Sequence, residues 1–337
     1  MTKENKLKEK LGMKIIARSP ARISLFGGGT DVDPFASEYG GKVLNMAINI
    51  RHKGILVPKE IGTYNEITAM NDCRKVNDLP NRGIDKKFDL IYEILRSYEF
   101  GRTFWFEDKF EGIQSAGLGS SASAAVSMIG AFNKWLGIEQ TKEEIAEKAW
   151  QMEINLGWIS GKQDQYASVL GGVNFLEFDH KVWNEPIEKG ICEEFVRWCL
   201  LVFSGKTRHS SDIQKKLRDN MSNPKAISAL KKMRTMAWEG RDALKKKNYH
   251  RVGQLLADSW EAKKVSNPAA TNERLNGIFD KASANGAIGG KILGAGGEGH
   301  ILFIVEPSNR QRLLNVLKLQ EIDFSIDYNG LEVKVEK

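Results

Sequence analysis

GLGSSA, residues Gly117 to Ala122, leads directly into a run of small residues over 122–136 that is predicted to form a helix. Glycine allows positive φ and close approach of the backbone, and the free amides at a helix start hold anions. The segment also carries two hydroxyls, and a hydroxyl beside a bound phosphate can bind Mg²⁺. A tight turn with a serine N-cap is the alternative, but such a turn rarely needs two glycines followed by alanines. We therefore expect a phosphate-binding loop here.

Other glycine patterns point to different nucleotide folds and fail on their context. GLGSSA also matches the dinucleotide fingerprint G-x-G-x-x-A, and residues 294–299 match G-x-G-x-x-G. This fingerprint should join a strand to a helix within a βαβ unit of about 30 residues, and neither copy does so. Residues 204–207 resemble the end of a P-loop, but the earlier glycine that a P-loop requires is Leu200. An NAD-dependent oxidoreductase therefore stays only as a distant alternative.

Two carboxylates are candidates for the chemistry beside this loop. Asp164 lies in the glycine-containing segment 160–165, and Glu153 lies on the polar edge of a predicted helix. Taken alone, Asp164 is more readily an N-cap or a solvated turn, and Glu153 a surface residue. Together with Ser120 and Ser121 they supply a phosphate cradle, oxygen ligands for Mg²⁺ and a carboxylate near an attacking hydroxyl, which is what phosphoryl transfer needs.

The composition is that of a globular protein with two domains. The chain has 337 residues, which exceeds the length of about 250–300 residues at which single cores stop growing. Its 50 Lys+Arg and 43 Asp+Glu give a net charge of +7, but the lysines are interleaved with acids, so no nucleic-acid partner is expected. The scattered Cys73, Cys192 and Cys199 form neither a disulfide framework nor a zinc site. Without a signal-peptide or membrane-span pattern, a cytoplasmic protein with no membrane partner is expected.

The order of elements predicts a strand-rich first part and a helix-rich second part. Strands are expected at 14–26, 42–50, 54–58, 65–70, 102–110, 171–178 and 195–203, and helices at 86–100, 122–136 and after Thr141, where Glu144 completes a capping box. Later helices are expected at 212–220, 224–247, 249–266, 271–285 and 309–319, and strands at 287–293, 301–305 and 331–336. The order helix, strand, strand, helix, strand at the end of the chain, preceded by the strand at 195–203, predicts a ferredoxin-like second domain. We place the boundary near residue 190, which gives domains 12–190 and 191–337.

Three segments in this order resemble the motifs of the GHMP kinase superfamily, over nearly the entire chain. The first is Ser19–Gly27 (SPARISLFG), the second Gly117–Ala122 and the third Lys291–Gly297 (KILGAGG). The resemblance implies an α+β fold with an N-terminal domain like domain 2 of ribosomal protein S5 and a ferredoxin-like C-terminal domain. ATP and a sugar would lie between these domains.

The resemblance also assigns roles to individual residues. The second motif would bind the triphosphate through Gly117, Leu118, Gly119, Ser120, Ser121 and Ala122, and Gly296 of the third motif would also bind ATP. Ser121 and Glu153 would bind Mg²⁺. Asp164 would lie beside the acceptor hydroxyl and accept its proton, or only orient it, and Arg22 would be the cation near that hydroxyl.

One difference from galactokinases narrows the range of possible substrates. Where those enzymes have Gly-Glu-His-Thr-Asp, this chain has GGGTD at 27–31. Segments 27–33, 40–45 and 160–165 look most similar to D-glycero-D-manno-heptose 7-phosphate kinases. These enzymes transfer the γ-phosphate of ATP to the anomeric hydroxyl and give the 1,7-bisphosphate for nucleotide-activated heptose synthesis. Fucokinases share much of the pattern but are typically much longer chains, and a fucokinase-like or other sugar-1-kinase remains the alternative.

A sugar phosphate would need hydroxyl acceptors and cations. The predicted substrate residues are Gly28, Gly29, Thr30, Asp31, Lys162 and Arg208, with Lys206 and His209 as further cations near the predicted site. A plain Asx turn is the alternative for Asp31, and a solvated surface cation for each basic residue. A sugar-phosphate-binding regulator without catalysis is a further alternative, but the retained carboxylates and serines argue against it. The sequence does not indicate an oligomeric state.

Overall fold

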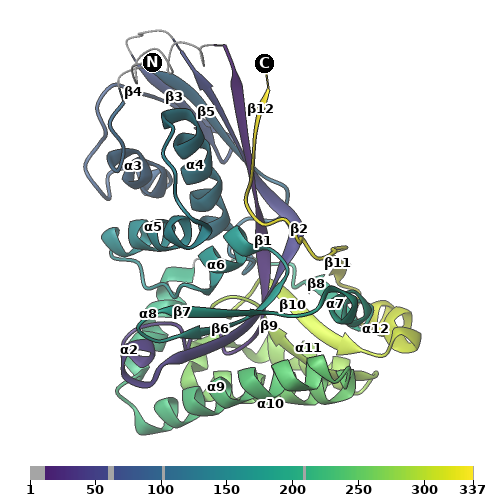
Figure 1. Ribbon diagram of the computed structural model, residues 1–337. Coiled ribbons are helices and arrows are strands. Elements are labelled where there is room, and N and C mark those ends of the chain that lie inside the picture. The colour runs from purple at the N-terminus through teal and green to yellow at the C-terminus, as the bar shows by residue number, and fades with distance from the viewer. Residues whose placement is uncertain (1–11, 60–63, 101–102, 208–209, 337) are drawn as a thin grey trace.

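The computed structural model describes residues 12–59, 64–100, 103–207 and 210–336, which form two sheets with helices packed around them (Figure 1). The larger sheet has eight strands in the order β12-β1-β2-β5-β3-β4, and β6 pairs with both β2 and β7. These strands are β1 (Lys14–Phe26), β2 (Gly41–Pro58), β3 (Asn65–Ala69), β4 (Asp72–Val76), β5 (Phe104–Phe110), β6 (Val173–Phe178), β7 (Val182–Pro186) and β12 (Glu332–Glu336).

The long strand β2 joins three neighbours into this sheet. It pairs antiparallel with β1 along most of its length, with β6 through Gly41–Met46 and with β5 through His52–Pro58. The sequence predicted two strands here, at 42–50 and 54–58, but residues 51–53 continue the strand between them. A Cβ at Gly54 would come within 3.2 Å of Phe106 and Ser127, so this glycine lets helix α4 lie close to the sheet.

Helices α4 (Ser120–Leu136) and α6 (Gln163–Leu170) pack against β1 and β2, and α3 (Asp89–Arg96) and α5 (Lys142–Asn155) pack against α4. The predicted small-residue helix is confirmed, and so is the capping box at the start of α5, where Thr141 and Glu144 bond each other's backbone. A short helix, α2 (Phe35–Tyr39), had no sequence prediction.

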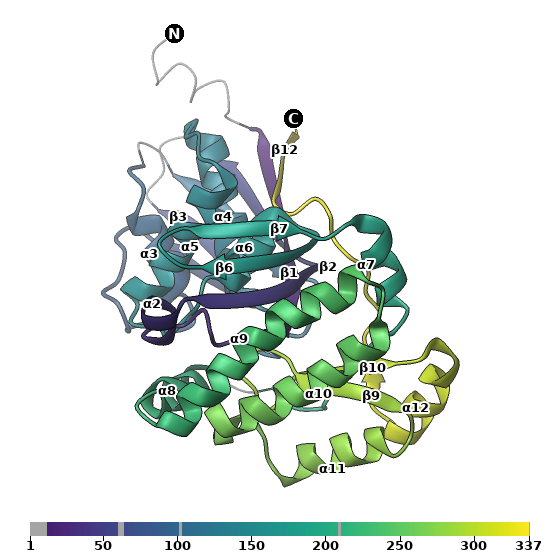
Figure 2. The ribbon, with the colours of Figure 1, turned by 60° about the horizontal axis from the view of Figure 1, so that its bottom comes forward.

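The smaller sheet has the strand order β11-β8-β10-β9, and two long antiparallel helices, α9 and α10, run side by side near it (Figure 2). Its strands are β8 (Cys199–Phe203), β9 (Ala287–Ile292), β10 (His300–Val305) and β11 (Gln320–Glu321). The helices of this part are α7 (Lys189–Val196), α8 (Ser210–Asn220), α9 (Pro224–Lys245), α10 (Tyr249–Ser266), α11 (Glu273–Ser283) and α12 (Arg310–Leu317), with short 3₁₀ turns at Pro268–Ala270 and Pro307–Asn309.

Two predictions about this second part were wrong. The strand expected at 331–336 does not extend the smaller sheet, because β12 crosses back and pairs with the edge of β1, so the C-terminal end lies beside the first strand (Figure 1). This pairing covers an edge whose backbone groups would otherwise be open. The strand expected at 195–203 begins only at Cys199, because Phe195 closes helix α7 and is buried there.

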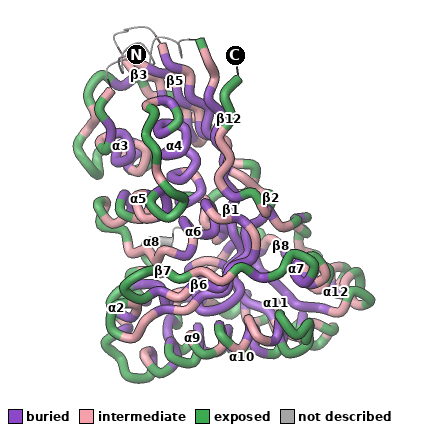
Figure 3. The backbone as a smooth tube through the Cα atoms, in the orientation of Figure 1, coloured by how far each residue is buried: buried purple, intermediate pink, exposed green. Residues whose placement is uncertain are grey.

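The two parts share a continuous buried core at their junction, where the tube in Figure 3 is mostly purple. Leu25 and Phe26 of β1 belong to the same apolar cluster as Leu256 of α10 and Leu302 of β10. The third glycine motif and the end of β1 are thereby fixed next to each other. The proposed domain boundary near residue 190 stays a prediction. Among the described residues, no helix combines the length and apolar character needed to span a membrane.

Candidate active site

The predicted phosphate loop precedes helix α4 and rests on the third glycine motif. Helix α4 begins at Ser120, and its N-cap residue Gly119 has a φ of +71°. Gly117 has a φ of +90°, and a Cβ there would lie 2.5 Å from the carbonyl oxygen of Leu293. A Cβ at Gly294 would likewise lie 2.8 Å from Gly117 Cα. Both loops therefore need glycine to touch, and the amides at the start of α4 form a site suited to phosphate.

Arg22 and Asp164 form a two-pronged ion pair directly beside this loop. Arg22 Nε and Nη2 each donate to one oxygen of Asp164, both at 2.6 Å, across 142 residues of sequence. Nη1 donates to the carbonyl oxygen of Gly117 at 2.7 Å, which ties the pair to the phosphate loop. Arg22 is buried on β1, whereas the Asp164 side chain, in the first turn of α6, keeps 23% of its surface exposed. The carboxylate is therefore oriented and still accessible.

Glu153 is a buried carboxyl at the end of α5, next to the phosphate loop. Ser160 Oγ donates to its Oε2 at 2.5 Å and Gln165 Nε2 at 2.9 Å, and Ser121 also hydrogen-bonds the side chain. Burial raises the pKa of Glu153 to about 7, and the negative charge of Asp164 adds to this, while the hydrogen bonds oppose it.

The pair Ser121 and Glu153 fits the requirements of Mg²⁺. Both present hard oxygen ligands at the phosphate loop, and Mg²⁺ is usually held by one or two protein oxygens together with substrate phosphates and water. In the parts of the chain that the structure describes, no group of three or more His, Cys, Asp or Glu side chains could hold a metal ion by itself. With one or two protein oxygens as ligands, Mg²⁺ takes its remaining ligands from substrate phosphates and water.

Asp31 connects the first glycine loop to helix α6. Its Oδ1 accepts from Gly29 N at 3.1 Å and from Gln163 Nε2 at 3.0 Å, and its Oδ2 accepts from Gln163 N at 3.1 Å. A Cβ at Gly161 would lie 2.0 Å from Oδ2, so only glycine fits there. Burial, and then the charge of Asp164, raises the pKa of Asp31. The carboxylate has little capacity left for sugar hydroxyls, with one acceptor position remaining on Oδ2.

The other predicted substrate residues differ in where they lie. Gly28 packs beside Gln163, and Gly29 faces Leu217 of α8. Thr30 exchanges hydrogen bonds with the backbone of Lys42, so its hydroxyl is used in holding the loop.

Among the described residues, neither Lys162 nor Lys206 forms an ion pair with Asp164. Lys162 Nζ bonds both oxygens of Glu147, at 3.0 and 2.7 Å, and lies 4.4 Å from the centre of the Trp150 ring. Lys206 is exposed, and Arg208 and His209 lie outside the described residues.

Gly296 and two lysines complete the third motif. Gly296 has a φ of +101° and packs against Ala270, while residues 117–122 touch the motif through Gly294. Lys291, which opens the motif, is buried, and Lys263 of α10 donates to the Gly294 carbonyl oxygen at 2.6 Å. The sequence analysis gave neither lysine a role. The position of Lys291 as the first residue of KILGAGG was the available signal, whereas Lys263 lies in an ordinary helical pattern.

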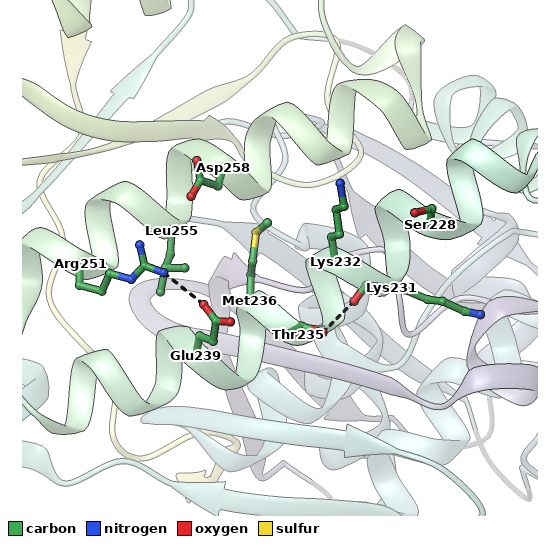
Figure 4. A pocket seen from close by; sticks show the side chains of 9 residues that line it. All are labelled: Ser228, Lys231, Lys232, Thr235, Met236, Glu239, Arg251, Leu255 and Asp258. Carbon is green, nitrogen blue, oxygen red and sulfur yellow. Dashed lines mark hydrogen bonds and ion pairs between the residues drawn. The ribbon is translucent and has the colours of Figure 1, made fainter.

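A separate hollow between α9 and α10 does not contain any predicted site residue (Figure 4). It is lined by polar and charged side chains, and Arg251 there is paired with Glu239 at 3.3 Å. The residues predicted from the motifs lie elsewhere, at the junction of β1, α4, α6 and the third motif.

Sequence comparison matches two profiles, "GHMP kinases N terminal domain" over residues 91–172 and "GHMP kinases C terminal" over 241–321. The first contains the phosphate loop, Glu153 and Asp164, and the second contains Lys263 and the third motif. The two matches therefore meet at the same group of side chains.

Individual relatives cover almost the whole chain. D-glycero-alpha-D-manno-heptose 7-phosphate kinase of Campylobacter jejuni is 30% identical over 95% of this chain and 99% of its own length. L-fucokinase/L-fucose-1-P guanylyltransferase of Bacteroides fragilis is 25% identical over 89% of this chain but only 35% of its own length. A solved structure described as "D-glycero-D-manno-heptose 1-phosphate kinase from Bacteriodes thetaiotaomicron" superposes with a TM-score of 0.78 at 26% identity, over 95% of this chain and 98% of that one.

Proposed function

Because the chain belongs to the GHMP kinase family and is a sugar kinase of that family, we propose that its acceptor is D-glycero-D-manno-heptose 7-phosphate. The γ-phosphate of ATP would pass to the anomeric C1 hydroxyl and give the 1,7-bisphosphate and ADP. The full-length similarity to the Campylobacter heptose 7-phosphate kinase supports this substrate.

The observation that carries the proposal is the Arg22–Asp164 pair, held against the carbonyl oxygen of Gly117. An acceptor hydroxyl bonded to Asp164 would lie beside the phosphate loop, where its oxygen can attack the γ-phosphorus. The bond from phosphorus to the leaving oxygen of ADP breaks, and the hydroxyl proton passes to the Asp164 carboxylate. Arg22 would offset the charge that develops on the transferred phosphate. Positioning and electrostatics then supply most of the rate.

The remaining predicted ligands take supporting roles. Residues Gly117–Ala122 would hold the phosphates through backbone amides, with Gly296 supporting the nucleotide from the third motif. Ser121 and Glu153 would hold Mg²⁺, which neutralises phosphate charge when bound. Gly28, Gly29, Thr30 and Asp31 would shape the sugar site. The phosphate of the sugar would need cations, for which Arg208 and Lys162 remain the candidates, Lys162 only after leaving Glu147.

A fucokinase-like activity is the second candidate. The B. fragilis relative, whose name includes L-fucokinase, matches 89% of this chain. The identity to the Campylobacter heptose 7-phosphate kinase is higher, at 30% against 25%, and this favours the heptose enzyme.

The test is ADP release from Mg-ATP over a panel of acceptors. The panel should contain heptose 7-phosphate, heptose 1-phosphate, free heptoses, fucose, galactose, mevalonate and homoserine. We expect the highest kcat/KM with heptose 7-phosphate. Turnover of fucose with none on heptose 7-phosphate would transfer the assignment to the fucokinase group.

A further inference from the structure

Three loops meet at the candidate active site, and a basic side chain from another element donates to one backbone carbonyl at the base of each. The pairs are Arg22 Nη1 with Gly117 O at 2.7 Å, Lys263 Nζ with Gly294 O at 2.6 Å, and Lys291 Nζ with Leu25 O at 3.1 Å. Leu25 stands just before the glycine loop that reaches Asp31. The three basic side chains therefore connect the substrate loop, the phosphate loop and the third motif.

The contact of Lys291 depends on an irregularity in β1. Ser24 pairs with Asn45 and Phe26 pairs with Leu44, so Leu25 has no partner in the register with β2. A bulge of this kind leaves backbone groups out of the ladder. Lys291 reaches across from β9 and supplies a donor to the Leu25 carbonyl oxygen. The lysine thus joins the smaller sheet to β1 at the edge of the site.

Lys291 lies in an environment that disfavours its charge. Its side chain is 2% exposed, and the neighbours that act on its ammonium group are the cations Lys263 and Arg22. Burial, then repulsion from these two groups, lowers the pKa of Lys291 well below its usual value. The negative charge that Arg22 pairs with, on Asp164, belongs to helix α6.

We propose that Lys291 is a positioning residue for the nucleotide, which takes up a proton from solvent when a polyphosphate binds at the Gly117 loop. The charged lysine then completes a centre of three cations, with Arg22 and Lys263, that holds the three loops around the phosphates. The proposal depends on the proposed function only in that a nucleotide binds at this loop.

The sign of the pH dependence follows from the charges around Lys291. A bound polyphosphate stabilises the ammonium form and raises the pKa of Lys291. Between the pKa values of the free and bound states, nucleotide binding takes up a proton, so affinity falls as pH rises. The charged groups involved are Lys263 on α10, Arg22 on β1 and Asp164 on α6, with Glu153 of α5 acting on Asp164. Glu153 titrates near pH 7 and would act in the opposite sense, because a metal displaces its proton.

Calorimetry of the full chain separates these effects. The probe is Mg²⁺-saturated β,γ-imido-ATP without sugar, titrated in two buffers of different ionisation enthalpy. The titration is carried out at about pH 8.5, because carboxyls and nucleotide phosphates are already ionised at that pH. We expect the wild type to show a buffer-dependent enthalpy that corresponds to proton uptake. Lys291→Met and Lys291→Gln should lose this dependence and bind about tenfold more weakly. Gln keeps an N–H donor for Leu25 and cannot gain a charge, which protects the test if the Met variant unfolds.

Lys246→Met is the matched control, because Lys246 is exposed at the end of α9 and should keep full proton uptake. Nucleotide binding without proton uptake in the wild type would overturn the proposal and leave the kinase assignment intact. Proton uptake that persists in Lys291→Gln would also overturn it. Failure of the wild type to bind the probe at all would contradict the proposed function, and this inference with it.

Discussion

At the scale of single residues, the proposed chemistry depends on two carboxylates with different surroundings. Asp164 is partly exposed and oriented by Arg22, whereas Glu153 is buried among hydroxyl and amide donors. The first environment suits a group that binds a substrate hydroxyl. The second suits a group that binds a metal ion together with nucleotide phosphates.

Asp164→Asn should lower kcat by about 10²–10⁴-fold while nucleotide affinity changes little. Asn preserves the shape but cannot take the hydroxyl proton and pairs less well with Arg22. Steady-state kinetics and nucleotide titration check this, with Asp179→Asn in the exposed turn between β6 and β7 as the control. Wild-type turnover in the Asp164 variant would remove this residue from the reaction.

Glu153→Gln should stabilise the metal-free protein at alkaline pH. The carboxyl has a pKa of about 7 when folded against 4.5 as its ordinary value, so its burial weakens folding progressively as pH rises between these values. The stability gained by the variant should be small near pH 5 and reach about 3 kcal/mol at most above pH 7. Thermal unfolding in EDTA from pH 5 to 8 measures it. Glu143→Gln, exposed on the same helix, should not show this rise, and a constant gain in Glu153→Gln would argue against a buried, protonated carboxyl.

Asp164 and Glu153 were candidates from the residues themselves, whereas Arg22, and its place near the same hydroxyl as Asp164 across 142 residues, came only from the family resemblance. Sequence reasoning did not foresee that Lys162 points elsewhere, because the competing partners Glu147 and Trp150 lie on α5, one helix away. It also gave no role to Lys263 and Lys291, since burial of a lysine is not visible in a sequence.

At the scale of elements, the site depends on loops that touch only because they lack side chains. Gly117→Ala should raise the KM for ATP about tenfold or more, because its Cβ would strike the Leu293 carbonyl oxygen. Gly137→Ala is the control: Gly137 also has positive φ, at +69°, but nothing lies within 4 Å of its Cβ position. Gly137→Ala should lose about 1–2 kcal/mol of stability through the left-handed backbone, and Gly117→Ala should lose more, because the clash adds to that cost. An unchanged KM in Gly117→Ala would show that the contact with the third motif does not shape the nucleotide site.

Most long elements were predictable, because α4, α9 and α10 have clear helical patterns and β10 is apolar after His300. The errors fell where tertiary contacts decide. Residues 195–198 were expected to begin a strand, but Phe195 and Val196 form the last residues of α7 and pack into the core. The β-alternation of 332–336 was correct, but a sequence does not say which of two sheets a strand joins.

At the scale of the whole molecule, residues 322–331 form a C-terminal strap between the two sheets. The strap begins beside β8, where Ile322 N donates to Leu201 O, and passes the end of α6, where Gly172 N donates to Asp327 O at 2.6 Å. Arg51 bonds Asp327 in the strap and Glu332 in β12. The strap thereby holds the C-terminal end of α6, the helix that carries Asp164.

Arg51→Met should lower the free energy of unfolding by about 3–5 kcal/mol, because it leaves the buried Asp327 carboxylate without its partner. Lys14→Met is the control: its ion pair with Glu336 joins β1 to β12 at 3.8 Å but is exposed, so its loss should cost less than about 1 kcal/mol. Denaturant unfolding compares the two. Equal losses would show that the strap is not held by the buried pair.

The activity proposed for this GHMP kinase is phosphorylation of a heptose 7-phosphate at C1. The direct measurement is ³¹P NMR of the product formed from Mg-ATP and D-glycero-D-manno-heptose 7-phosphate. We predict a second phosphate resonance that couples to the anomeric proton, with ADP formed in equal amount. An untouched heptose 7-phosphate, in a preparation that converts fucose to fucose 1-phosphate, would contradict the claim.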